Sequence, residues 1–107
     1  MESEPPRQVT LLELSRSWES LLQVERMPAE SEYRIRRLID RALPLADKMF
    51  LKTLKGREMM WQCAEQTLLV RNELESGGVR LYEALTELEK TYDDLLKKAY
   101  EFRIKAG

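Results

Sequence analysis

The sequence predicts an all-α protein: a small antiparallel helical bundle with a long C-terminal helical hairpin of coiled-coil character. Apolar residues make up 43% of the chain and charged residues 35%, with four glycines and four prolines, a mixture typical of helical bundles. Apolar residues recur at helical spacings, and the period-two alternation of a strand is absent. The most regular series, with spacings of four and three throughout, is Leu81, Leu85, Leu88, Tyr92, Leu95, Ala99 and Phe102.

We expect a single helical domain over residues 10–107, preceded by a flexible lead-in over residues 1–9, which are polar and contain two prolines. Thr10 and Glu13 have the spacing of a capping box, which predicts that the first helix begins here. That helix should end before Pro28, because proline cannot continue it, and Pro28 suits the first turn of the next helix. The expected helices span about residues 10–26, 29–43, 45–75 and 79–105.

Two helix breakers compete in the middle of the chain. Proline inside a helix costs about 3 kcal/mol, whereas an internal glycine costs about 1 kcal/mol. We therefore place the kink or corner at Pro44 and expect the third helix to continue through Gly56. Ser76-Gly77-Gly78 should end that helix, because glycine accepts the left-handed conformation of a helix C-terminus.

A hairpin across this turn pairs residues whose numbers sum to about 155. The predicted pairs are Leu81 with Leu74, Leu85 with Val70, Leu88 with Thr67, Tyr92 with Cys63, Leu95 with Met60 and Ala99 with Gly56. The last pair joins two small residues, which should let the helix backbones approach closely. The third helix is apolar on several sides, which indicates a central helix with more than one neighbour.

The residues exclude most enzyme chemistry. The chain has no histidine, and no glycine-rich phosphate loop is present, so we expect no enzyme, cofactor, metal site or small-molecule ligand. Cys63 is the only cysteine, and we interpret it as a buried, unreactive thiol. Trp18 and Trp61 are interpreted as core anchors, with a partner-binding patch as the alternative for either.

Charge is distributed unevenly along the chain. Residues 34–57 hold eight bases and two acids, whereas the segments on either side are acidic. Six of these bases form a strip at near-helical spacing, hereafter the basic strip: Arg34, Arg37, Arg41, Lys48, Lys52 and Lys55. It is a solvated face, a face opposed to the acidic first or last helix, or a docking site for an acidic protein, an anionic lipid surface or nucleic acid. Few aromatic residues accompany the bases, which disfavours nucleic acid.

A second apolar line lies about a quarter-turn from the regular series of the last helix. This second line consists of Tyr82, Leu96, Tyr100 and Ile104. One hairpin partner cannot cover both lines, so either the first two helices or another chain covers the second one. Phe102 should meet only Thr53. The candidate partner-binding residues are Tyr82, Tyr92, Leu96, Tyr100, Phe102 and Ile104. We therefore expect a protein–protein interaction subunit, an adaptor or a chaperone-like assembly factor, that binds another protein or a second copy of itself. A regulatory module that docks an anionic surface through the basic strip is the alternative.

Location is inferred from what the chain lacks. The N-terminus has no apolar core of a signal peptide, and no apolar run approaches the ~20 residues that a membrane span requires. A lone cysteine gives no indication of an oxidising compartment. We expect an intracellular, cytoplasmic protein.

Overall fold

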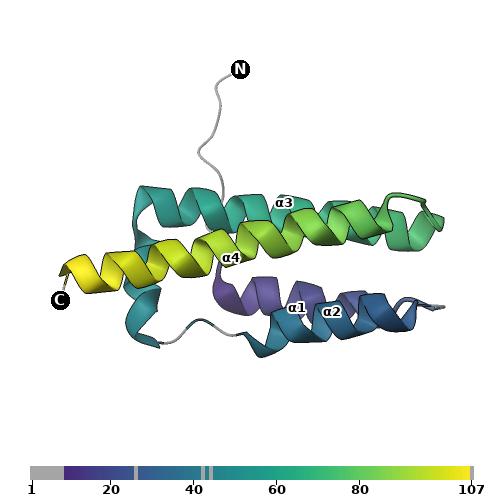
Figure 1. Ribbon diagram of the computed structural model, residues 1–107, viewed down its shortest axis with the longest axis horizontal. Helices are drawn as coiled ribbons and strands as arrows, with labels where there is room; N and C mark the ends of the chain where they lie inside the picture. Colours follow the sequence, from purple (N-terminus) through teal and green to yellow (C-terminus); the bar gives the residue numbers. More distant parts are fainter. Residues whose placement is uncertain (1–8, 26, 42, 44, 107) are drawn as a thin grey trace, which may run out of the picture.

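The computed structural model describes residues 9–25, 27–41, 43 and 45–106. Its elements, in chain order, are α1 (Leu11–Leu21), α2 (Ala29–Asp40), the 3-10 helix η1 (Leu45–Lys52), α3 (Leu54–Ser76) and α4 (Leu81–Ala106). These helices confirm the predicted all-α bundle. Figure 1 shows α3 and α4 as a long antiparallel hairpin, with α1 and α2 packed as a shorter pair along one side of it. Within the described residues, none of the helices has the length and apolar character of a membrane span.

The first helix begins as predicted and ends earlier than predicted. The Thr10 hydroxyl accepts the Glu13 N–H at 3.1 Å, and the Thr10 N–H donates to the Glu13 carboxylate, also at 3.1 Å, so the capping box is complete. The last turn tightens, because Gln23 and Val24 donate to carbonyls three residues back. Such three-residue bonds satisfy end carbonyls without extending an α-helix, so α1 stops at Leu21.

The second helix begins at Ala29, with Pro28 as its N-cap residue in extended conformation. It ends at Asp40, three residues before the predicted end, and Arg41 leaves the helical region with φ −92° and ψ 55°. Pro44, where we expected the kink or corner, lies outside the described residues, as do the lead-in residues 1–8.

The predicted continuous helix over 45–75 is wrong in its first part. The segment forms η1 and a separate α3, and the break falls at Thr53. The Thr53 hydroxyl accepts the Gly56 N–H at 3.0 Å and donates to the Phe50 carbonyl at 2.7 Å. A side chain that satisfies backbone groups in this way competes with the continued helix and favours a new N-terminus.

Gly56 has a role beyond the predicted pairing with Ala99. A Cβ atom at this position would lie 2.1 Å from the Phe50 carbonyl oxygen and 2.9 Å from the Leu51 Cα atom. The closest approach at Gly56 is therefore to the backbone of η1, which folds back against the first turn of α3, rather than to Ala99 of α4.

The turn between α3 and α4 follows the prediction. α3 ends at Ser76, and Gly77 caps it in the left-handed conformation, with φ 66° and ψ 30°. The Gly78 N–H then donates to the Glu73 carbonyl at 2.8 Å, the pattern of a glycine C-cap. α4 begins at Leu81, two residues later than predicted.

The residues of the predicted pairs lie in or beside the hairpin core. Five pairs are buried on both sides: Leu85 and Val70, Leu88 and Thr67, Tyr92 and Cys63, Leu95 and Met60, and Ala99 and Gly56. The pair nearest the turn, Leu81 and Leu74, is half-buried. α3 also packs on α1 and η1, which confirms that it is a central helix.

A hydrogen-bonded relay holds α1 against α3. Trp18 is buried, and its indole Nε1–H donates to the Thr67 hydroxyl at 2.9 Å. That hydroxyl donates in turn to the Cys63 carbonyl at 2.8 Å. The Trp18 ring also meets Tyr92 of α4 edge-on, with 5.0 Å between ring centroids. Since a buried donor must be paired, the relay fixes the register of α1 on the hairpin.

Candidate protein-interaction surface

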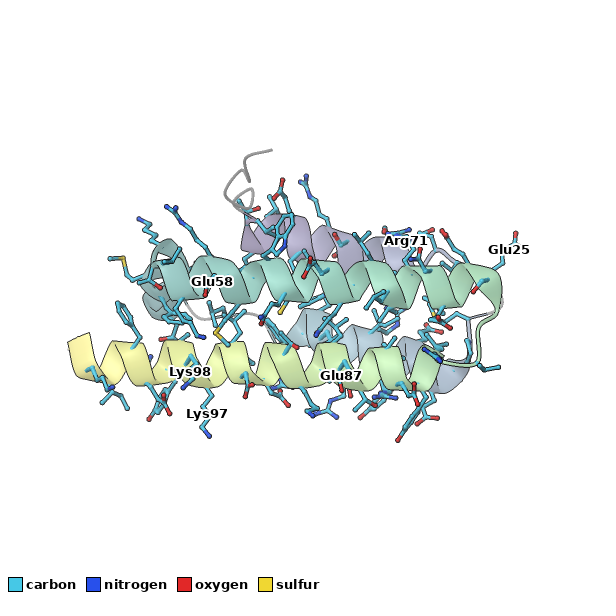
Figure 2. All side chains as sticks on the ribbon, turned by 90° about the horizontal axis from the view of Figure 1, so that it is seen from above. Glu25, Glu58, Arg71, Glu87, Lys97 and Lys98 are labelled. Atoms are coloured by element: carbon cyan, nitrogen blue, oxygen red, sulfur yellow. The ribbon has the colours of Figure 1, made fainter. Side chains whose placement is uncertain are left out.

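An apolar groove runs between α1 and α3, beside the Trp18–Thr67 contact. It has a volume of about 420 Å³. We call it the α1/α3 groove. Its lining consists of Val9, Glu13, Leu14, Ser17, Trp61, Ala64, Glu65, Thr67, Leu68 and Arg71. The Arg71 guanidinium bonds the Ser20 hydroxyl of α1, and Figure 2 shows Arg71 on the edge of α3 that faces α1. The two walls are therefore held at a fixed separation.

The groove leaves large apolar side chains in contact with water. Leu68 is 59% exposed, and Trp61 is only half-buried although Trp18 is buried. The core-anchor interpretation thus holds for Trp18, whereas Trp61 lies at the surface of the groove. Such a concave apolar site with a few charged groups at its edges suits the apolar side chains of another protein.

Sequence reasoning missed this groove. Leu54, Trp61 and Leu68 follow one another at intervals of seven, so they lie near one side of α3. This side is not the one that packs on α4, and Leu54 is 74% exposed. The seven-residue spacing was the available signal, but it is hidden in a helix with apolar residues on every side.

The predicted partner-binding residues of α4 divide into three groups. Tyr82, Tyr100 and Ile104 are exposed, Leu96 and Phe102 are half-buried, and Tyr92 is buried. Tyr82 lies near the start of α4, and the Arg34 guanidinium covers its ring at 4.9 Å from the centroid. Tyr100 and Ile104 lie together one turn apart near the other end. The exposed residues therefore do not form one continuous surface.

Tyr92 belongs to the core, which corrects its assignment to a partner surface. It is fully buried, and its hydroxyl donates to the Arg41 carbonyl at 2.5 Å. Burial raises the pKa of Tyr92 to about 12, with a further contribution from Cys63. The phenol therefore stays neutral and structural.

We expected Phe102 to meet only Thr53, but the structure gives its ring a larger partner. It packs on Phe50 of η1, with ring centroids 5.7 Å apart. Next to this contact, Arg103 Nε lies 3.2 Å from the carboxylate of the buried Asp47. η1 thus covers Phe102, because the break at Thr53 lets η1 turn back, whereas Tyr100 and Ile104 of the same helix stay exposed.

The basic strip does not act as one surface. The Arg34 guanidinium donates to the Glu89 carboxylate of α4 through Nε at 2.9 Å and through Nη2 at 2.6 Å. Nη2 also donates to the Thr86 hydroxyl at 3.1 Å. The hydrogen bond to Glu89 raises the pKa of Arg34. Arg41 lies 2.5 Å from Asp93. These two arginines hold α2 against the acidic side of α4. For them, the basic strip is opposed to the acidic last helix, which was one of the interpretations of the sequence.

The remaining bases of the strip face solvent. Arg37, Lys48, Lys52 and Lys55 are all exposed, and the lysines lie on η1 and the first turn of α3. The strip is therefore split, because Arg34 and Arg41 pair with carboxylates of α4, whereas Arg37 and the lysines of η1 and α3 are exposed.

The described residues offer no constellation for catalysis by the thiol. Cys63 is fully buried, and desolvation raises its pKa to about 12, so the thiolate nucleophile does not form near neutral pH. No group of three or more metal-ligating side chains occurs in the described part of the chain.

No protein-family model matches the chain, and no curated protein or solved structure matches it either.

Proposed function

We propose that this protein is a non-enzymatic interaction subunit that holds a helix of another protein in the α1/α3 groove. The exposure of Leu68 beside Trp61 is the observation on which this rests, since each apolar side chain left in water forgoes ~1.5–3 kcal/mol. A bound apolar ridge recovers that free energy.

The shape of the groove favours a helical occupant. Trp18 contacts Thr67 and Ser20 contacts Arg71, so α1 and α3 run in the same direction along the groove. Two such helices present a furrow that a third helix fills by packing its ridges between theirs. α1 has 11 residues, or ~16 Å of helix, so about three turns of the partner make contact.

The residues at the edges set the preferred chemistry of the partner helix. Glu65 is an exposed acid of the lining, whereas the Arg71 guanidinium is already bonded to Ser20 and lies 3.9 Å from the Glu75 carboxylate. A partner with leucine or other large apolar residues at spacings of three and four, flanked by lysine or arginine on the Glu65 side, matches this arrangement.

Site-specific photo-crosslinking tests the proposal. A benzophenone amino acid replaces Leu68 in one version of the full chain and Gln62, an exposed residue of the same helix, in another. After irradiation in the native cell, position 68 should give a protein adduct that position 62 does not. Leu68→Glu should abolish binding of the identified partner, while Gln62→Glu, which also adds one negative charge, should retain it. Identical adducts from both positions, or unchanged binding by Leu68→Glu, would exclude the groove.

Self-association through the end of α4 is a separate candidate. It rests on Tyr100 and Ile104, which are 51% and 59% exposed and lie beyond the Arg41–Asp93 contact with α2. Sedimentation over a wide concentration range should then show a dimer that Tyr100→Glu/Ile104→Glu converts to a monomer. A monomer at every concentration would exclude this form of the interaction.

A further inference from the structure

The segment of residues 48–57, hereafter the basic–apolar segment, has an unusual surface. It covers most of η1 and the first turn of α3. Each of its exposed side chains is either a base or a large apolar group, and the segment contains no acid. The exposed residues are Lys48, Met49, Lys52, Leu54, Lys55 and Arg57.

The fold accounts for the buried residues of this segment and not for the exposed apolar ones. A 3-10 helix repeats every three residues, which places Asp47 and Phe50 against α4. Met49 falls on another face of η1, and Leu54 is the first residue of α3; the two side chains are 59% and 74% exposed. Neither side chain contributes to the hydrophobic core.

The charge of the segment is not neutralised within the described part of the chain. Arg34 and Arg41 lie within 4.0 Å of carboxylates of α4, whereas no base of the basic–apolar segment has such an ion pair among the described residues. The apolar surface also continues onto α1. A shallow groove of about 280 Å³ joins Lys48 and Lys52 to Leu51 and to residues 9–12, of which Leu12 is 59% exposed.

We propose that the basic–apolar segment docks the protein on the surface of a bilayer that contains anionic lipids. Stable attachment of a peripheral protein takes two contributions, insertion of apolar side chains and attraction of bases to anionic headgroups. Met49 and Leu54 supply the first, and the neighbouring lysines supply the second. The segment contributes no residue to the lining of the α1/α3 groove, but the two surfaces adjoin, because Val9 lines both that groove and the shallow groove beside Lys48 and Lys52.

Two features favour a bilayer over an acidic protein surface. Leu54 and Met49 protrude, whereas the apolar anchors of protein interfaces sit in concave, well-packed pockets. The bases are mostly lysines, which are flexible point charges suited to a fluid layer of headgroups, rather than arginines, which suit fixed bidentate pairing with carboxylates.

Co-sedimentation with vesicles tests the proposal on the full chain. One set of vesicles contains phosphatidylcholine only, and the other contains phosphatidylcholine with phosphatidylserine. The protein should bind the second set and not the first, and added salt should weaken binding. Each lysine near an anionic surface contributes a factor of roughly five, so Lys48→Gln/Lys52→Gln/Lys55→Gln should lower the partition coefficient about 100-fold. Met49→Ser/Leu54→Ser should weaken binding without changing the net charge.

A matched variant separates the segment from net charge. Lys90, Lys97 and Lys98 are exposed on α4, and changing all three to glutamine removes the same charge elsewhere. This control should retain binding within about two-fold, and thermal melts should show that all variants are folded. Absent binding, equal binding to both vesicle sets, unchanged binding by the segment variants, or an equal loss in the α4 control would each overturn the proposal.

Discussion

Gly56→Ala is expected to destabilise the protein, although its position inside the first turn of a helix favours the opposite. Alanine is preferred over glycine in a helix by about 1 kcal/mol. The new methyl group, however, would lie 2.1 Å from the Phe50 carbonyl oxygen. That oxygen belongs to the backbone and accepts the Thr53 N–H and hydroxyl, so no rotation of a side chain relieves the clash.

The magnitude follows from how η1 responds. Overpacking of a tight contact costs about 1–3 kcal/mol, and the gain in helix propensity offsets about 1 kcal/mol of it. An approach of 2.1 Å to a backbone atom is severe, so the upper part of the overpacking cost, about 2–3 kcal/mol, applies here. We therefore expect a net loss of about 1–2 kcal/mol when η1 shifts and stays bound. If η1 detached, Phe50 would lose its buried contact with Phe102, and the loss would reach the upper end of that range or exceed it.

Urea denaturation of the purified proteins measures this change, and limited trypsin digestion locates it. Lys48 and Lys52 lie in η1, so a displaced η1 should be cleaved faster there. Asn72→Ala, at an exposed position of the same helix, is the control and should be neutral or slightly stabilising. If Gly56→Ala were as stable as the unmodified protein, the inferred contact between η1 and α3 would be wrong.

Two further changes probe the core. Thr67→Val keeps the shape of the side chain but leaves the Trp18 Nε1–H unpaired, so we expect a loss of about 1–3 kcal/mol in urea denaturation; Thr67→Ser, which keeps the hydroxyl, should lose less. Stability should fall above pH ~9–10, because unfolded Cys63 and Tyr92 then release protons that the folded state, with both pKa values raised to about 12, retains. Each group contributes a slope of at most ~1.4 kcal/mol per pH unit. Tyr92→Phe should be less stable than the unmodified protein at neutral pH, because it loses the hydrogen bond to the Arg41 carbonyl. The difference in unfolding free energy between the two proteins should narrow between pH 10.0 and about 12, because only the unmodified protein loses stability through Tyr92. A constant difference would contradict the raised pKa.

The hairpin was predictable because its information is local and repeated. Leu85, Leu88 and Leu95 recur at spacings that only a helix satisfies, and the glycines after Ser76 define the turn that sets the register. The Thr10–Glu13 capping box is likewise a contact between residues three apart. Patterns of this kind can be recognised in the sequence without knowing which other helices pack against them.

The remaining features depend on contacts between distant parts of the chain. The comparison of Pro44 with Gly56 weighed local penalties and could not detect the Phe50 carbonyl that requires glycine. Tyr92 lies in the regular series, and its role as an internal anchor follows from Trp18 and Arg41, far away in sequence. The spacing of Trp61 and Leu68 indicates an apolar side of α3. Whether that side forms a groove depends on where α1 packs, which the spacing does not reveal.

The placement of α1 also has a kinetic consequence. A short turn joins α3 and α4, so their contacts are local, whereas Trp18 and Thr67 are separated by 49 residues. Because closing longer loops costs more entropy, we expect the hairpin to form early and α1 to dock late. The α1/α3 groove then forms only in the last step of folding, so a partner cannot bind it in a partly folded chain. In the native state, α1 should open more often than α3, and amide exchange in α1 should slow when a partner helix occupies the groove.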